Sequence, residues 1–195
     1  TIPRFFLLSM VTVLTFFLLS GREIPATTAK TLNAEKNTTH FPAKARIEKL
    51  QQKAGLAEKF VREKKYNDQY CFLIDMSLPS GQNRFFIYDL RSDSVLSSAP
   101  VAHGNCFEYW LEGRRYSNVV GSGCTSLGKY RIGIPYTGKW GYSYKLHGLD
   151  SSNNNAFERT VVLHGHSCVP ENAVEDEICQ SNGCPTVAPG FLLTL

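Results

Sequence analysis

Three features are scarce in this chain of 195 residues, and each scarcity excludes a class of protein. Charged residues make up 19% of the chain against 43% hydrophobic residues, a balance too apolar and too weakly charged for a disordered protein. Basic residues form no run of five or more, so the thinly spread net charge of +4 indicates no nucleic-acid partner. No uncharged apolar run reaches the roughly 20 residues that a membrane-spanning helix needs. What remains is a folded chain with room for one domain.

The N-terminal segment is predicted to be an export signal and not part of the fold. Residues 5–19 carry no charge, and Arg4 precedes them. A basic start followed by an apolar core of about 7–15 residues is typical of a signal peptide. We expect residues 1–29 to be this signal and the protein to be exported. The alternative is a retained anchor, in which case this segment is the chain's contact with a membrane.

Beyond the signal, the pattern predicts a linker, one helix and then a mostly β domain. Residues 30–45 are rich in Lys, Thr, Asn, Ala and Pro and are expected to be a linker. From Arg46 to about Lys65, apolar residues recur at helical spacing, which predicts an amphipathic helix that covers a core. The domain is expected to span residues 46–195. The predicted strands, bounded by Pro, Gly, Ser and Asn, are residues 71–76, 84–90, 94–104 and 160–166.

A histidine and a cysteine near the C-terminus form a candidate catalytic pair. His164 and His166 lie two residues apart on one predicted strand, so both rings point to the same face. Ser181 follows His164 after sixteen residues and opens the run Ser-Asn-Gly-Cys. A thiol nucleophile such as Cys184 needs a base, and an imidazole that titrates near neutrality can serve. Gly183 permits a tight turn, and the amides of Gly183 and Cys184 are candidates for an oxyanion hole.

This spacing, H-x16-S-x-G-C, resembles the active-site signature of the YkuD-type L,D-transpeptidases, and most closely that of their murein L,D-transpeptidase catalytic-domain branch. The resemblance covers about Phe72 to Pro185. It implies a mostly β domain, a β-sandwich or barrel, behind the leading amphipathic helix. The further segments that carry it, in that branch's order, are FLIDMSLPSGQNRFFIYDL (72–90), PVAHG (100–104), YSN (116–118), TSLGKYRIG (125–133), YTGKWGYSYKLHGLD (136–150), NNNAFERTVVLHGH (153–166) and SNGCP (181–185).

The resemblance also implies peptidoglycan chemistry in the periplasm or at the cell wall. Cys184 would be the nucleophile and His164 its base, with the Gly165 carbonyl orienting the ring of the base. The thiolate would attack the third residue of a stem tetrapeptide, expel the terminal D-Ala, and pass its thioester to an amine of a second stem or to water. Because a thioester conserves the acyl energy, no cofactor or metal is implied.

Several further residues are expected to bind the stem peptide. Ser181 and Asn182 belong to the run that carries the nucleophile. Arg159 and Asn155 are candidates for contacting a substrate carboxylate, the alternatives being a salt bridge and a turn cap. His147, at the end of a predicted strand, either lines the cleft or has a structural role. The aromatic residues that either line a glycan-facing cleft or pack in the core and hairpins are Tyr109, Trp110, Trp140, Tyr142 and Tyr144.

Two departures from the family pattern raise the alternative of a non-catalytic peptidoglycan-binding domain. Asn182 stands where these enzymes carry His or an aromatic residue. Only eleven residues follow Cys184, and the apolar tail 188–195 is not expected to supply the family's closing helix and strand. This tail suggests a C-terminally truncated domain.

A zinc-dependent wall hydrolase is the other alternative, because His-x-His on a strand is a recurrent zinc geometry. His164 and His166 would then need a third ligand, for which Cys184, Cys168 or a distant acid is available. No HExxH-type pattern supports this alternative.

Six cysteines leave several pairings open. Cys184 should stay unpaired, with a thiol pKa depressed mainly by His164. Free buried thiols are the alternative to disulfides for the rest. The chain is expected to act as a monomer. The pairings with the shortest loops are Cys168–Cys179 and Cys106–Cys124, which leave Cys71 over.

Overall fold

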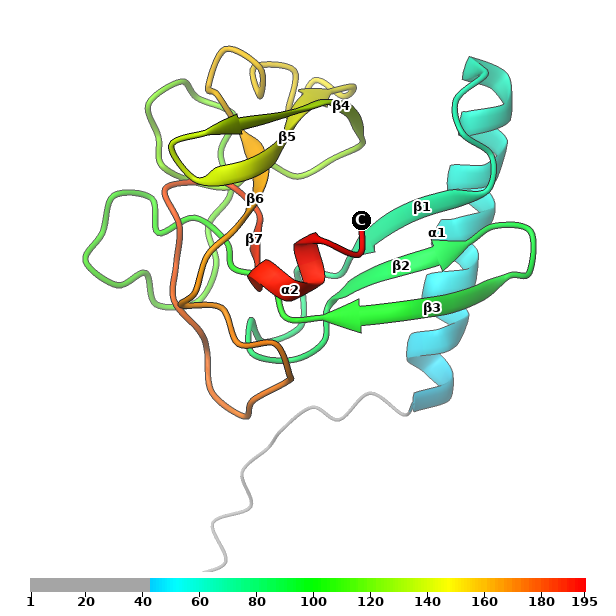
Figure 1. The fold of residues 1–195 in the computed structure, drawn as a ribbon, viewed down its shortest axis with the longest axis horizontal. Coiled ribbons are helices and arrows are strands. Elements are labelled where there is room, and N and C mark those ends of the chain that lie inside the picture. The colour runs from blue at the N-terminus through cyan, green and yellow to red at the C-terminus, as the bar shows by residue number, and fades with distance from the viewer. Residues whose placement is uncertain (1–42) are drawn as a thin grey trace, which may run out of the picture. The chain divides into compact units, whose positions relative to one another are not determined.

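Two β-sheets and a long helix make up the part of the chain that the structure, a computed structural model, describes: residues 43–195 (Figure 1). The expected signal peptide, 1–29, lies outside the described residues, as does the expected linker up to residue 42. The last three residues assigned to that linker are helical, because α1 (Ala43–Lys64) begins at Ala43 and not at Arg46. Ala and Lys are strong helix formers. In residues 43–195, no helix has the length and apolar character needed to cross a membrane.

The first sheet is antiparallel and has the order β1-β2-β3, with β1 at Tyr70–Ile74, β2 at Phe85–Asp89 and β3 at Ser94–Ala99. These strands match three of the predicted runs. The third predicted run, residues 94–104, extends beyond the observed strand. The strand ends before Pro100 because proline has no N–H to give to a sheet.

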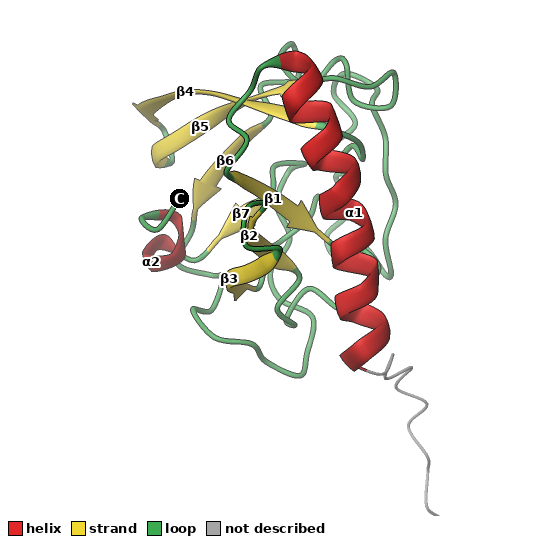
Figure 2. Ribbon diagram, turned by 90° about the vertical axis from the view of Figure 1, so that its right-hand side faces the viewer, coloured by secondary structure: helices red, strands yellow, loops and turns green. Residues whose placement is uncertain are grey.

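Strand β2 is buried on both faces, which places it between two clusters of apolar side chains. Phe85 and Ile87 belong to the main core, while Phe86 and Tyr88 pack with helix α1. Alternate side chains of a strand point to opposite faces, so one sheet contacts both layers. Figure 2 shows α1 running along one side of this sheet. The helix covers the smaller cluster with the buried residues Leu50 and Ala54, so the predicted amphipathic helix is confirmed.

The second sheet has the order β4-β5-β6-β7 and carries the candidate site. Strands β4 (Tyr130–Gly138) and β5 (Gly141–Gly148) form a long hairpin that was not among the predicted strands. Strand β6 (Val162–Gly165) pairs antiparallel with β5 and parallel with the short β7 (Thr186–Val187). The candidate base and the segment after the candidate nucleophile are therefore neighbours in one sheet.

The C-terminal tail packs into the main core. Its helix α2 (Pro189–Leu192) buries Phe191 and Leu192, and the Phe191 ring lies edge-on to Phe85 at 5.3 Å (Figure 1). Residues 188–195 thus supply a four-residue helix, for which Pro189 suits the first turn, but no strand follows it within residues 43–195. The expectation of a truncated domain stays a prediction. The mostly β class with a leading helix is confirmed, and the finer β-sandwich or barrel assignment stays a prediction.

Candidate active site

A cavity of about 160 Å³ opens beside strands β6 and β7. It brings together four residues of the predicted site: His164, Ser181, Asn182 and Cys184. The other residues that line it are Ala102, Trp140, His166, Cys168, Cys179, Gln180 and Thr186.

The His164 ring is held on both of its nitrogens. Nδ1 lies 3.1 Å from the Gly165 carbonyl oxygen, and Nε2 lies 3.1 Å from the Thr186 hydroxyl. A carbonyl only accepts hydrogen bonds, so Nδ1 carries the proton and Nε2 is the unprotonated nitrogen. Burial lowers the pKa of His164; the Gly165 carbonyl opposes this shift, and His166 adds to it. The ring is therefore neutral at neutral pH and able to accept a proton.

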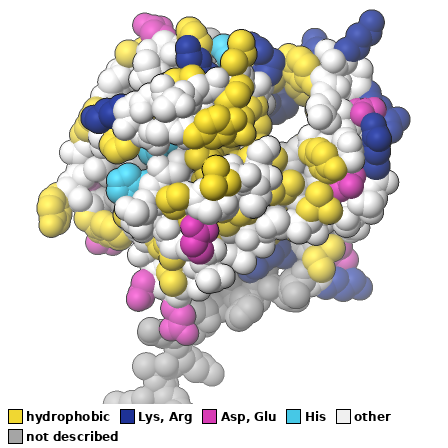
Figure 3. Space-filling view, in the orientation of Figure 1, with side chains coloured by type: hydrophobic (Ala, Val, Ile, Leu, Met, Phe, Trp, Pro, Cys, Tyr) yellow, Lys and Arg dark blue, Asp and Glu magenta, His cyan; other side chains and the backbone are white. Residues whose placement is uncertain are grey.

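Trp140 covers the candidate base. Its ring stacks on His164 at 5.1 Å and meets His166 edge-on at 5.9 Å, while Lys139 Nζ lies 4.9 Å from the Trp140 ring centre. Figure 3 shows histidine and hydrophobic side chains together on the face that carries the β4–β5 hairpin. Of the two alternatives for Trp140, the structure favours a residue that lines the cleft. Direct stacking on the base was missed, although Gly138 and Gly141 around a two-residue turn were a signal for a hairpin tip there.

The nucleophile turn, residues 181–184, is tied together by the Ser181 hydroxyl. This hydroxyl donates to the Cys184 carbonyl at 2.6 Å and accepts from the Gly183 N–H at 3.1 Å. Gly183 has φ +116°, and a Cβ there would lie 2.9 Å from the Cys124 carbonyl oxygen. Only glycine fits this position without displacing the backbone beside it.

The two amides expected to form an oxyanion hole differ in this structure. The Gly183 N–H already has Ser181 as its acceptor. For the Cys184 N–H, no acceptor lies within residues 43–195. The Cys184 amide is therefore the better placed of the two to receive a developing negative charge.

Burial dominates the ionisation of the candidate nucleophile. Cys184 is unpaired, as expected, and burial raises the pKa of its thiol, with the Val162 N–H and the Arg159 charge acting in the opposite direction. The prediction of a thiol pKa depressed by His164 is therefore wrong. The parallel register of β6 and β7 explains the contact with Val162. His164 pairs with Thr186, so two residues earlier on each segment Val162 lies opposite Cys184.

The raised thiol pKa predicts a distinct pH profile for alkylation of Cys184. The thiolate reacts with iodoacetamide and the thiol does not, so the rate should climb with pH and reach its midpoint above the ordinary value of about 8.5. Mass analysis of the Cys184 peptide measures this rate. A midpoint below neutrality would instead reveal a thiolate–imidazolium pair in the resting protein and contradict this prediction.

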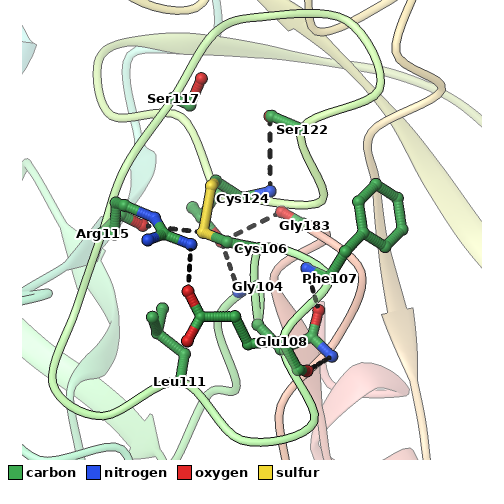
Figure 4. The surroundings of a disulfide bond; sticks show 12 residues. Gly104, Cys106, Phe107, Glu108, Leu111, Arg115, Ser117, Ser122, Cys124 and Gly183 are labelled. Carbon is green, nitrogen blue, oxygen red and sulfur yellow. Dashed lines mark hydrogen bonds and ion pairs between the residues drawn. A yellow bond between two sulfur atoms is a disulfide. The ribbon is translucent and has the colours of Figure 1, made fainter.

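A disulfide-closed loop supports the nucleophile turn (Figure 4). The structure contains the two shortest-loop pairings, Cys106–Cys124 and Cys168–Cys179. Next to the first of them, the Thr125 hydroxyl donates to the Gly183 carbonyl at 3.0 Å and accepts from the Gly104 N–H at 2.9 Å. The residue that follows the Cys106–Cys124 loop thus joins its C-terminal end to the turn that presents Cys184.

Arg159 and Asn155 hold the same loop and do not line the cavity. Arg159 donates to the carbonyls of Ser117, at 2.8 Å, and Cys124. The Asn155 amide donates to the Asn118 carbonyl at 3.0 Å. Of the roles foreseen for these two residues, the geometry favours structural ones, although the partners of Arg159 are two carbonyls and the Ser122 hydroxyl and not a carboxylate.

Removing the disulfide at Cys106 and Cys124 should destabilise the domain. The bond closes a loop with a sequence separation of 18, for which chain entropy predicts a loss of about 3 kcal/mol in the free energy of unfolding. Urea unfolding of the Cys106→Ser/Cys124→Ser double variant measures it, and Cys71→Ser, which removes an unpaired cysteine, is the control. A double variant as stable as the unmodified protein would contradict the supporting role.

His147 lies apart from the cavity. It sits near the end of β5, and its ring stacks on Phe157 at 4.8 Å. The zinc alternative is also weakened, because Cys168 is bonded to Cys179 and so provides no thiolate, and His166 Nδ1 accepts the Cys168 N–H. In residues 43–195, no group of three or more His, Cys, Asp or Glu is arranged to hold a metal ion.

A buried histidine with an oriented ring and an unpaired cysteine in one cavity define a candidate cysteine-dependent acyl transferase. The model of the L,D-transpeptidase catalytic domain family, YkuD_2, matches residues 43–194, and the chain belongs to this family. The resemblance drawn from the sequence is thereby confirmed. No curated protein and no solved structure gave a significant match.

Proposed function

We propose that this protein is a peptidoglycan L,D-transpeptidase, or the related L,D-carboxypeptidase, that acts after export in the periplasm or at the cell wall. The observation that carries the proposal is the pair of an unpaired Cys184 and a neutral His164 in one cavity, within a domain of this family. The substrate would be a peptidoglycan stem tetrapeptide.

In the first half of the reaction, the acyl group moves from nitrogen to sulfur. His164 Nε2 takes the proton of Cys184 as sulfur attacks the carbonyl of the third stem residue, and the Cys184 N–H receives the developing oxyanion. The carbon–nitrogen bond to D-Ala then breaks, and the imidazolium returns its proton to the leaving amine. A thioester on Cys184 and free D-Ala are the products.

In the second half, an acceptor takes the acyl group from sulfur. His164 removes a proton from an amine of a second stem, or from water, and the Cys184 thiolate leaves. The amine gives a crosslink and water gives a trimmed stem. Both outcomes share the acyl-enzyme, so the same residues serve a transpeptidase and a carboxypeptidase.

Incubation of the exported protein with a stem tetrapeptide tests the proposal. We expect D-Ala to be released and the intact mass to increase by the mass of the acylated tripeptide. A carbapenem should form a covalent adduct on the same cysteine. A protein that releases no D-Ala and forms no adduct, yet binds sacculi, would contradict this function and support a non-catalytic wall-binding domain.

A further inference from the structure

A buried hydroxyl stands between the candidate base and the backbone of the nucleophile. Thr186, the first residue of β7, is 3% exposed and is the register partner of His164. Its Oγ1 lies 3.1 Å from His164 Nε2 and 3.4 Å from the carbonyl oxygen of Cys184. One hydroxyl thus reaches both members of the candidate catalytic pair.

The direction of this hydroxyl depends on the protonation of the ring. With Nδ1 donating to the Gly165 carbonyl, Nε2 of the neutral ring is a lone pair, so Thr186 must donate to it. A protonated Nε2 is instead a donor, and the hydroxyl must then accept. Its own proton needs a new acceptor, and the Cys184 carbonyl oxygen lies within reach at 3.4 Å from the same hydroxyl oxygen.

We propose that Thr186 is a positioning residue for His164, and that its hydroxyl turns from the ring to the Cys184 carbonyl when the ring becomes protonated. The role of His164 as base rests on the proposed function, whereas the contacts of the hydroxyl do not. The transferred proton leaves the Cys184 sulfur and ends on Nε2, which then donates to Thr186 Oγ1. The step is balanced within the protein and needs no other reactant.

The charged groups around His164 and Cys184 do not replace the Thr186 hydroxyl as the hydrogen-bond partner of His164 Nε2. His166 opposes a charge on the His164 ring, and Arg159 favours the thiolate of Cys184. Lys139 lies against the ring of Trp140, which stacks on His164. Among the described residues, none of these groups hydrogen-bonds to Nε2, whereas Thr186 does. The imidazolium therefore depends on Thr186 for its hydrogen bond at that nitrogen.

Two variants separate the effect of the hydroxyl from that of the side-chain volume, because valine keeps the shape of threonine and serine keeps its hydroxyl. Thr186→Val removes the hydroxyl, and Thr186→Ser keeps it. The matched control is Thr194→Val, which makes the same change where the hydroxyl bonds to the Phe191 carbonyl at 2.7 Å, outside the cavity. The readouts are the alkylation rate of Cys184 by iodoacetamide as a function of pH and the titration of His164 by NMR.

We expect Thr186→Val to react about ten- to hundredfold more slowly at neutral pH, because a hydrogen bond to a charged group is lost. The pKa of His164 should fall in this variant, since both forms of the ring lose a hydrogen bond and the charge-assisted bond of the imidazolium is the stronger of the two. Thr186→Ser and Thr194→Val should match the unmodified protein in both measurements.

Two results would overturn the proposal. One is a Thr186→Val protein with the unmodified rate and His164 titration; the other is a Thr186→Ser protein that behaves like Thr186→Val. Neither readout uses a stem peptide. If the unmodified protein fails to process the tetrapeptide while Thr186→Val still shifts the His164 titration, the proposed function fails and the assignment of Thr186 stands.

Discussion

Replacing Cys184 with alanine should abolish acyl transfer while leaving the domain folded. Without the sulfur no thioester forms, and we expect the release of D-Ala to fall by at least about 10⁴-fold. The thiol is unpaired and belongs to no disulfide, so its removal should change the free energy of unfolding by only about 1 kcal/mol. Release of D-Ala and intact mass after incubation with tetrapeptide measure the effect.

The second unpaired cysteine provides the matched control. Cys71 packs beside the cluster between α1 and the first sheet, and burial raises the pKa of its thiol to about 11. Cys71→Ala should therefore keep full activity and the covalent adduct. An adduct that disappears in Cys71→Ala, or persists in Cys184→Ala, would show that Cys184 is not the nucleophile.

That His164 and Cys184 line one cavity could be predicted from the sequence, because both lie in short segments with few conformational choices. An apolar, β-branched run forms the central strand that carries His164. Gly183 adopts a positive φ in the turn, a conformation that other residues rarely adopt. The sixteen residues between His164 and Ser181 suffice to return the chain, and the short β7, which follows Cys184, lies beside β6 in the sheet. Local pattern and tertiary structure agree here.

The β4–β5 hairpin could not be predicted from the same kind of pattern. Gly133 and Pro135 interrupt β4, where the register with β5 shifts between Ile132 and Pro135. Proline is tolerated there because β4 is the edge strand of its sheet and needs no partner on its outer side. Periodicity in the sequence does not distinguish such an edge strand from a loop.

The ionisation of Cys184 was also beyond the sequence. A histidine partner suggests a thiolate–imidazolium pair, but the pKa of each group depends on its burial, which only the fold determines. Burial raises the pKa of Cys184 and lowers that of His164, so both shifts favour the neutral thiol and the neutral ring. The expected active form at rest is the neutral pair, with proton transfer coupled to attack on the substrate.

The neutral pair gives His164→Gln a predictable signature. Loss of the base should lower the rate of acyl-enzyme formation about 10²- to 10⁴-fold. In the unmodified protein, activity should fall on the acidic side as Nε2 becomes protonated, below the ordinary histidine value of about 6.5 because the pKa of His164 is lowered. The variant should lose this acidic limb, since glutamine does not titrate. The rate of carbapenem adduct formation as a function of pH measures both effects.

His147→Gln is the control for this prediction, because His147 carries the same ring outside the cavity and contacts Phe157. It should retain the acidic limb and most of the rate. If His164→Gln kept the acidic limb, another group would have to be the base, and His166, which meets the same tryptophan edge-on, would be the next to test. A normal rate in His164→Gln would exclude general-base catalysis by His164 altogether. The acidic limb of the pH profile and the rate together distinguish these outcomes, because only the loss of a titrating base changes both.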